Sequence, residues 1–327
     1  MPSFLQDWKY PELVASGRHA RTERIMSVRS PYLRSVAVAF YINIGRAGNL
    51  ALFPAEVAVQ ALRKQLIEDY AIFKVTGKLS LGRRAFSKKT LLAISKEVHR
   101  QNQAQIKKID SGKESPQMRR ITEGVQYINQ LVGTQAGSNK SMEAILFSVC
   151  VESWIAFETL CNDLWFVALD HGPADWRKQV RLKDHKLKGW DDSQTSIEDV
   201  DLNQIADPQE KYGTSLRDKG ASLRRLADIK SWYKTTFRSG AEKLFNENER
   251  ICALSAVRNA IVHKAGRADR KYLNAVKKDP ELQTDLNRVI PLDGAVVREL
   301  RNVAIHLGTE LLLYVDGVLT SPFAKKH

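Results

Sequence analysis

Arg258, Asn259 and His263 are the residues of this chain whose types and spacing best suit chemistry on a phosphate. A guanidinium stabilises negative oxygens, an amide orients a phosphate or an imidazole, and a histidine exchanges protons near neutral pH. The surrounding sequence predicts one helix from about residue 242 to 264, with Gly266 as its C-cap. His263 would then lie in the last turn, at the negative end of the helix dipole, as suits a general acid or base.

Helix geometry limits how these side chains work together. At about 100° per residue, Asn259 and His263 share a face, and Leu254 and Val257 lie on the opposite side. Arg258 and His263 are about 140° apart, so they do not easily converge on one phosphate within one chain. A symmetric partner chain would bring a second arginine and histidine into the same cleft. The alternative is a surface arginine and histidine near a helix C-terminus, where cations are favoured in any protein.

The same spacing recurs at Arg301, Asn302 and His306. These residues lie inside the predicted final helix, and Arg301 and His306 flank its apolar stripe on opposite sides. We interpret this helix as a packing element and the match as a coincidence. The pair stays an alternative site if Arg258 and His263 are structural.

Other chemistries lack their motifs. The sequence contains no G-x-G-x-x-G, no H-E-x-x-H and no closely spaced His and Cys ligands. Gly77 and Gly82 have P-loop spacing, but Arg83 and Arg84 stand where Lys and Ser or Thr are required. Nucleotide hydrolysis by a P-loop and zinc chemistry are therefore disfavoured, and we expect neither a metal nor a cofactor.

The C-terminal part resembles the HEPN superfamily of helical domains, whose ribonuclease members carry an R-polar-x-x-x-H motif. The resemblance covers roughly residues 139–318 and is carried by ESWIAFE at 152–158, by Arg258-Asn259 to His263, and by Gly266 and Asp269. It implies a homodimer in which both motif copies line one cleft. It also implies metal-independent cleavage of RNA, often in toxins or antiviral defence.

The chemistry that fits this resemblance is transesterification. The 2′-hydroxyl of RNA attacks the adjacent phosphorus, His263 assists proton transfer, Arg258 stabilises the phosphoryl oxygens, and Asn259 has a minor orienting role. The products are a 2′,3′-cyclic phosphate and a 5′-hydroxyl, and DNA is inert because it lacks the nucleophile. Glu152 and Glu158 are candidates for a supporting acidic residue, as HEPN domains often carry one here. The simpler interpretation is that each pairs with a nearby Lys or Arg.

The elements that position these residues are predicted to be helices. A broad apolar stripe that includes Leu146, Phe157 and Trp165 predicts a long helix to about Leu169, which His171-Gly172-Pro173 ends. We expect a mainly α fold, with a C-terminal HEPN-like bundle over residues 139–318. A polar, acid-rich stretch near 183–210 interrupts it as a surface insertion.

The N-terminal part gives mixed patterns, which indicate a basic domain over residues 1–135 that is mostly helical or α+β. Alternation over 36–44 is typical of a strand or of an alanine-rich buried helix, and 45–49 predicts a turn. Pro54 would open a helix, and Ser87 would cap another. One more helix would end near residue 132, and the Gly/Ser-rich stretch 133–138 would link the two parts.

Most of the net charge of +14 falls in the N-terminal part, where 22 basic and 10 acidic residues give +12. Such an excess points to a polyanionic partner, here RNA. The basic residues of the 83–108 region are candidate RNA contacts, namely Arg83, Arg84, Lys89, Lys96, Arg100 and Lys107. An ordinary solvated helix face explains the same pattern equally well.

Three function classes stay open. The leading one is a metal-independent endoribonuclease, a toxin or antiviral effector. The second is a noncatalytic HEPN-like nucleic-acid or nucleotide-binding module. The third is an interaction protein such as one half of a toxin–antitoxin pair, with the acid-rich insertion docking an antitoxin or a regulatory protein.

The cysteines and the hydropathy bear on where the protein works. Cys150, Cys161 and Cys252 form no C-x-x-C pair and suggest buried thiols in a reducing cytoplasm. The longest apolar run, at 36–42, is far shorter than the roughly 20 residues of a bilayer span. We therefore expect a cytoplasmic protein without a membrane partner.

Overall fold

The fold is mainly α. The computed structural model describes residues 21–77, 86–110, 138–187 and 211–321, which contain helices and no β-strand. Their order is α3 (Arg21–Ile25), η1 (Pro31–Leu33), α4 (Arg34–Thr76), α5 (Lys88–Asp110), α7 (Ser138–His171), α8 (Ala174–Leu187), α9 (Tyr212–Asp218), α10 (Leu226–Phe237), α11 (Ser239–Glu247), α12 (Ile251–Lys264), α13 (Arg270–Ala275), η4 (Pro280–Leu282) and α14 (Gly294–Thr320). One isolated bridge, Arg267 to Val289, pairs extended backbone within this part.

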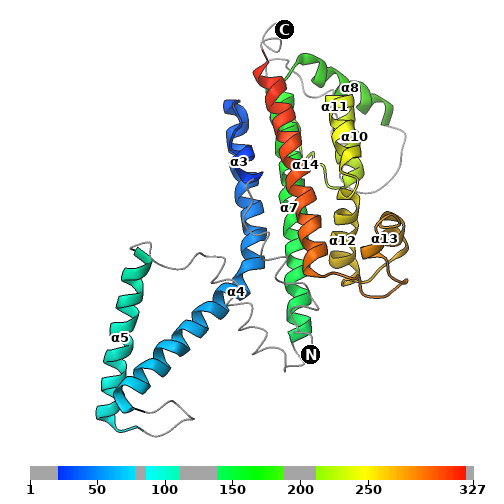
Figure 1. The fold of residues 1–327 in the computed structure, drawn as a ribbon. Coiled ribbons are helices and arrows are strands. Elements are labelled where there is room, and N and C mark those ends of the chain that lie inside the picture. Colours follow the sequence, from blue (N-terminus) through cyan, green and yellow to red (C-terminus); the bar gives the residue numbers. More distant parts are fainter. Residues whose placement is uncertain (1–20, 78–85, 111–137, 188–210, 322–327) are drawn as a thin grey trace.

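Helix α7 is the central element of the bundle. It packs against α4, α14, α9 and α12, and Figure 1 shows it between α3–α4 on one side and α10–α12 on the other. Its apolar residues lie on several faces, and Leu146, Phe157 and Trp165 are all fully buried. A helix that is apolar on most sides is stable only when neighbours cover it, so α7 carries the core. The predicted end at His171-Gly172-Pro173 is confirmed.

The predicted strand over 36–44, the turn at 45–49 and the helix start at Pro54 are wrong. All three lie inside the single helix α4. Val36, Phe40 and Ile44 are buried at a spacing of four, whereas Ile42 is exposed, so the pattern is helical burial in an apolar segment. Figure 1 shows that α4 changes direction along its length, and Pro54 explains a bend there because its ring disrupts the preceding turn.

The far end of α4 and α5 form an arm beside the bundle (Figure 1). Ser87 caps α5 as predicted, since its Oγ accepts from the Thr90 amide at 3.2 Å. Glu97 of α5 accepts hydrogen bonds from Arg100 and Gln101 and from Lys74 of α4. These bonds, led by the one from Arg100, lower the pKa of Glu97 to about 2, so this carboxylate holds the two helices together as an anion.

The predicted helix 242–264 is two helices, α11 and α12, with a short break between them. At the break the side chain of Asn248 donates to the Leu244 carbonyl at 2.9 Å, which competes with continuation of the backbone ladder. Arg250 then binds Asp279 and Glu281 at 2.9 and 2.8 Å and anchors the start of α12. The break lets α12 take its own direction against α7.

The hydrophobic core is continuous between the first half of α4 and the helices after residue 138. A side chain at Gly308 of α14 would lie 2.5 Å from the Phe40 ring, so these two helices are in close contact. Buried Asp316 accepts from the backbone amides of Arg29 and Ser30, which fixes the chain before α4 to α14. The described residues of both parts therefore share one core.

Within the part of the chain that the structure describes, three helical stretches are long and apolar enough to cross a membrane, by length and composition only: Pro31–Ala55, Lys140–His171 and Gly294–Thr320. About half of each stretch is buried inside the bundle, which gives these apolar residues a partner in the protein itself. The predicted helix ending near 132, the linker at 133–137 and residues 188–210 of the insertion lie outside the described residues. Residues 183–187 belong to α8.

Candidate functional site

Helix α12 places the motif residues on its outer side. Leu254, Val257 and Ala260 are buried against the bundle. Asn259 and His263 are exposed, as the predicted helical spacing requires. The sequence therefore identified the outward face of α12, although it missed where this helix begins.

The end of α12 fixes the position of His263, which lies in the last turn as predicted. The C-cap is Ala265, in the left-handed region at φ 51°, and not the predicted Gly266, which follows it at φ 75°. The amides of Ala265 and Gly266 both donate to the Ala260 carbonyl, the second at 3.0 Å, so this carbonyl is satisfied at the end of the helix. A Cβ on Gly266 would lie 2.4 Å from the Phe147 ring, so only glycine lets this corner contact α7 so closely.

Glu158 of α7 is the acidic residue that the fold brings to Arg258. Its Oε2 accepts a 2.7 Å hydrogen bond from the indole of Trp154, one turn earlier on the same helix. Burial raises the pKa of Glu158, while that hydrogen bond and the charges of Arg258 and Arg224 act to lower it. The carboxylate is thus held in place, partly desolvated and flanked by two cations.

Arg258 is half-buried, and its described hydrogen bond is local. Its NH1 donates to Oδ1 of the adjacent Asn259 at 2.9 Å. Its Nε is buried and has no hydrogen-bond partner among the described residues. Arg250, the residue just before α12, is by contrast bound by Asp279 and Glu281 at the start of η4. Arg258 is therefore not used as an ion-pair anchor of the described fold and keeps donors for another group.

Glu152 and Asp269 are not part of this cluster. Glu152 is half-buried on α7. It is six residues from Glu158, which separates the two by about 120° around the helix axis, so the two carboxylates lie on different sides of the helix. Asp269 accepts from the Tyr272 amide at 2.8 Å and caps α13. Of the acidic residues noted in the sequence, Glu158 alone is brought to Arg258 within the described chain.

The second motif lies in the packing helix α14. Arg301 is 2% exposed, and burial lowers its pKa to about 10. His306 lies 3.9 Å from Glu310, which in turn binds Arg24 of α3 at 2.8 Å. These residues join α14 to the core and to α3, and Arg301 is out of reach of a nucleic acid.

The basic residues of α5 lie on the arm, away from α12 (Figure 1). Lys89 and Lys96 are exposed there. Arg100 is paired with Glu97 at 2.6 Å, so the carboxylate offsets its positive charge. Arg83 and Arg84 lie outside the described residues, as does the side chain of Lys107. The described candidates, Lys89, Lys96 and Arg100, therefore do not form one surface with the motif.

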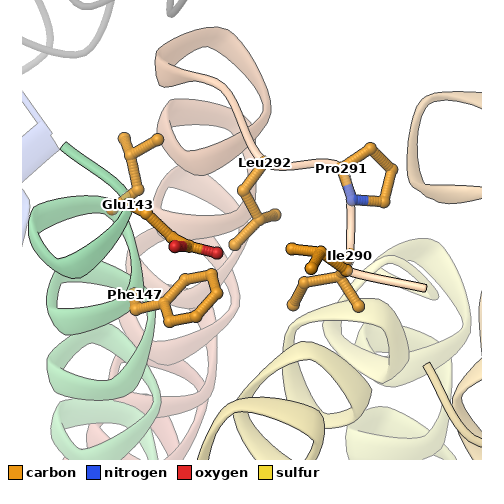
Figure 2. Close-up of a pocket in the computed structure, with 7 residues that line it drawn as sticks. Glu143, Phe147, Ile290, Pro291 and Leu292 are labelled. Carbon is orange, nitrogen blue, oxygen red and sulfur yellow. The ribbon is translucent and has the colours of Figure 1, made fainter. Parts of the chain in front are cut away.

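A pocket of about 260 Å³ lies beside the corner that ends α12. Figure 2 shows Glu143 and Phe147 of α7 facing Ile290, Pro291 and Leu292 across it. The Ile290 amide donates to the Gly266 carbonyl at 2.9 Å, which connects the pocket wall to that corner. Sequence reasoning missed this pocket, because residues more than 140 positions apart form it and no local pattern joins them.

The described residues contain no group of three or more His, Cys, Asp or Glu arranged to hold a metal ion. No family model, no curated protein and no solved structure matches this chain. The HEPN resemblance therefore rests on the motif residues and their placement alone.

Proposed function

We propose that the protein is a metal-independent endoribonuclease of the HEPN type that acts as a homodimer. The observation that carries this proposal is the outward side of α12. There Arg258, Asn259 and His263 form no hydrogen bond or ion pair with side chains of other described elements. An arginine and a histidine left available on a rigid helix next to a fixed carboxylate suit phosphodiester chemistry.

A second copy of the chain supplies what one helix cannot. Because Arg258 and His263 are about 140° apart on α12, two antiparallel copies are needed to surround one phosphate. Val262, on the same outward side, is 49% exposed, and Ile155 of α7 is 40% exposed. Exposed apolar side chains beside a polar cluster are typical of an interface, so we assign this face to the dimer.

The proposed reaction needs only these side chains. One His263 imidazole accepts the proton of the 2′-hydroxyl as its oxygen forms a bond to phosphorus. The bond from phosphorus to the 5′-oxygen breaks, and the partner chain's copy of this histidine, in its protonated form, gives a proton to that oxygen. Arg258 stabilises the negative charge on the non-bridging oxygens.

The test compares His263→Ala with His306→Ala, because the second motif provides a matched control within the same chain. Purified proteins are incubated in EDTA with mixed RNA and with matched DNA, and fragment ends are analysed. We expect the wild type and His306→Ala to cut RNA to 2′,3′-cyclic phosphate ends and to leave DNA intact. His263→Ala should be slower by about 10²–10⁴-fold.

Two outcomes would contradict the proposal. Equal cleavage by the wild type and His263→Ala would show that another site or a contaminant acts. RNA that is retained but not cut by the wild type would favour the noncatalytic binding module.

A further inference from the structure

The segment that joins α9 to α10 is fixed to α7 by one side chain. Oδ1 of Asn162 accepts from the Leu223 amide at 2.6 Å. Its Nδ2 donates to the Leu223 carbonyl at 3.1 Å and to the Glu158 carbonyl at 2.9 Å. Both the oxygen and the nitrogen of this side-chain amide are therefore hydrogen-bonded. The Leu223 side chain is fully buried. The backbone on both sides of Leu223 has a defined position on α7.

This fixation determines where the next residue, Arg224, lies. Asn162 is one helical turn from Glu158, so Arg224 follows a backbone attached beside that carboxylate. The Nε of Arg224 donates to Ser222 at 2.9 Å, and its side chain is exposed. The guanidinium forms no ion pair within 4 Å among the described residues. Its neighbour Arg225, in contrast, is bound to Asp228 at 2.8 Å.

Two arginines from different elements act on this carboxylate. Arg258 comes from α12 and Arg224 from the segment before α10, and Glu158 of α7 is held by the Trp154 indole. The charges of both arginines act on Glu158. Two guanidinium groups and one carboxylate leave a net positive charge, which a bound anion would neutralise.

We propose that Arg224 and Arg258 form a two-arginine phosphate site in which Glu158 separates the guanidinium groups and Asn162 acts as a positioning residue for Arg224. The site takes a phosphate of a single-stranded RNA backbone, and this assignment rests on the proposed ribonuclease function. Arg258 contacts the reacting phosphate and Arg224 a neighbouring one. A planar guanidinium can bind phosphate oxygens through two parallel hydrogen bonds, which makes arginine suitable for both roles.

The test measures binding apart from cleavage. A short fluorescent RNA with 2′-O-methyl groups lacks the nucleophile, so its anisotropy reports affinity alone. We expect Arg224→Ala to weaken binding by about tenfold and to reduce the slope of log affinity against log salt by about one. Arg225→Ala removes an adjacent exposed arginine and should change the affinity by less than about twofold, since that side chain is engaged locally.

The positioning role of Asn162 has its own readout. If Asn162 acts through Arg224, Asn162→Ala should reproduce the weaker binding and the lower salt slope, and the double variant should be no weaker than Arg224→Ala. Additive losses, or an unchanged salt slope in Asn162→Ala, would overturn that role. If Asn162→Ala does not fold, Asn162→Gln keeps the amide but displaces it, and the same comparison applies.

Different results would refute the phosphate site and the proposed ribonuclease function. Equal binding by Arg224→Ala, Arg225→Ala and the wild type would overturn the phosphate site even if the protein cuts RNA. A wild type that binds the modified RNA through Arg224 but cuts no RNA would keep the site and refute the nuclease.

Discussion

At the level of single residues, the environment of Glu158 conflicts with a charge on its carboxylate. Burial raises its pKa, and the Trp154 hydrogen bond and two nearby arginines only partly oppose that effect. A charged carboxylate in such a place lowers the stability of the fold, whereas a neutral residue would not. Functional sites often retain a group that lowers stability in this way.

We therefore expect Glu158→Gln to raise the thermal unfolding midpoint. The amide oxygen can still accept from Trp154, while the buried charge is gone. A raised folded-state pKa means that the folded protein binds this proton more tightly than the unfolded chain. The contribution of Glu158 to stability therefore falls as pH rises from the ordinary carboxyl pKa to the folded one, and is constant above it.

The measurement is the melting midpoint of both proteins between pH 4 and 8. The advantage of Glu158→Gln should increase with pH and then level off. An advantage that shrinks as pH rises would mean that the arginines outweigh burial and that the sign assigned here is wrong.

At the level of elements, α12 combines a buried side with an outward side that carries both polar chemistry and apolar surface. Arg258, Asn259 and His263 share that outward region with Val262, whose side chain is about half exposed in the single chain. If two chains meet there, Val262 lies within the interface. The dimer and the active site are then disrupted by the same change.

We expect Val262→Glu to give a monomer and to reduce RNA cleavage by more than about tenfold, because two carboxylates would be buried near the symmetry axis. Leu286→Glu is the control, since Leu286 is exposed to a similar extent on a different segment. Light scattering during gel filtration reports the mass, and the RNA assay reports activity. A monomeric wild type, or a dimeric Val262→Glu with full activity, would refute the placement of the interface.

At the level of the whole molecule, the first half of α4 belongs to the core that supports α7 and α14. Phe40 lies over Gly308, and a Cβ there would also be 2.8 Å from Leu160 of α7. The basic charge lies mostly in the N-terminal part, whereas the motif lies in the C-terminal part. Their shared core means that unfolding of α4 should affect α7 as well.

Phe40→Ala should lower the free energy of unfolding by about 3–5 kcal/mol, the usual cost of removing a buried phenylalanine. Ile42→Ala, two residues away and 54% exposed, should cost much less. Denaturant unfolding with hydrogen exchange checks this. In Phe40→Ala, the backbone amides of α7 and α14 should lose protection from exchange as well as those of α4. A loss of protection confined to α4 would mean that the two parts fold independently.

The sequence by itself determined the helical class, the C-terminal end of α7 and the cap of α5, because these depend on periodicity and on residues within one turn. It also determined that Asn259 and His263 share a face of α12, which is a matter of spacing. It failed at 36–44, where an apolar segment alternates and leaves strand and helix equally compatible. It failed again at Asn248, where a side-chain bond to the backbone breaks a helix that the spacing predicted.

Only the tertiary structure decided which charged residues meet. Glu152 and Glu158 have similar surroundings in the sequence, but the direction of α12 brings Arg258 to Glu158 alone. Arg224 and Arg225 are neighbours of the same type. The hydrogen bonds of Asn162 to Leu223 fix the backbone before Arg224 next to the helix that carries Glu158, whereas Asp228 binds Arg225. Likewise, the two copies of one motif differ in burial: Arg258 is half-buried and His263 exposed, whereas Arg301 is buried. Spacing fixes the side of a helix on which a residue lies, and packing decides whether that side meets solvent, the core or another charge.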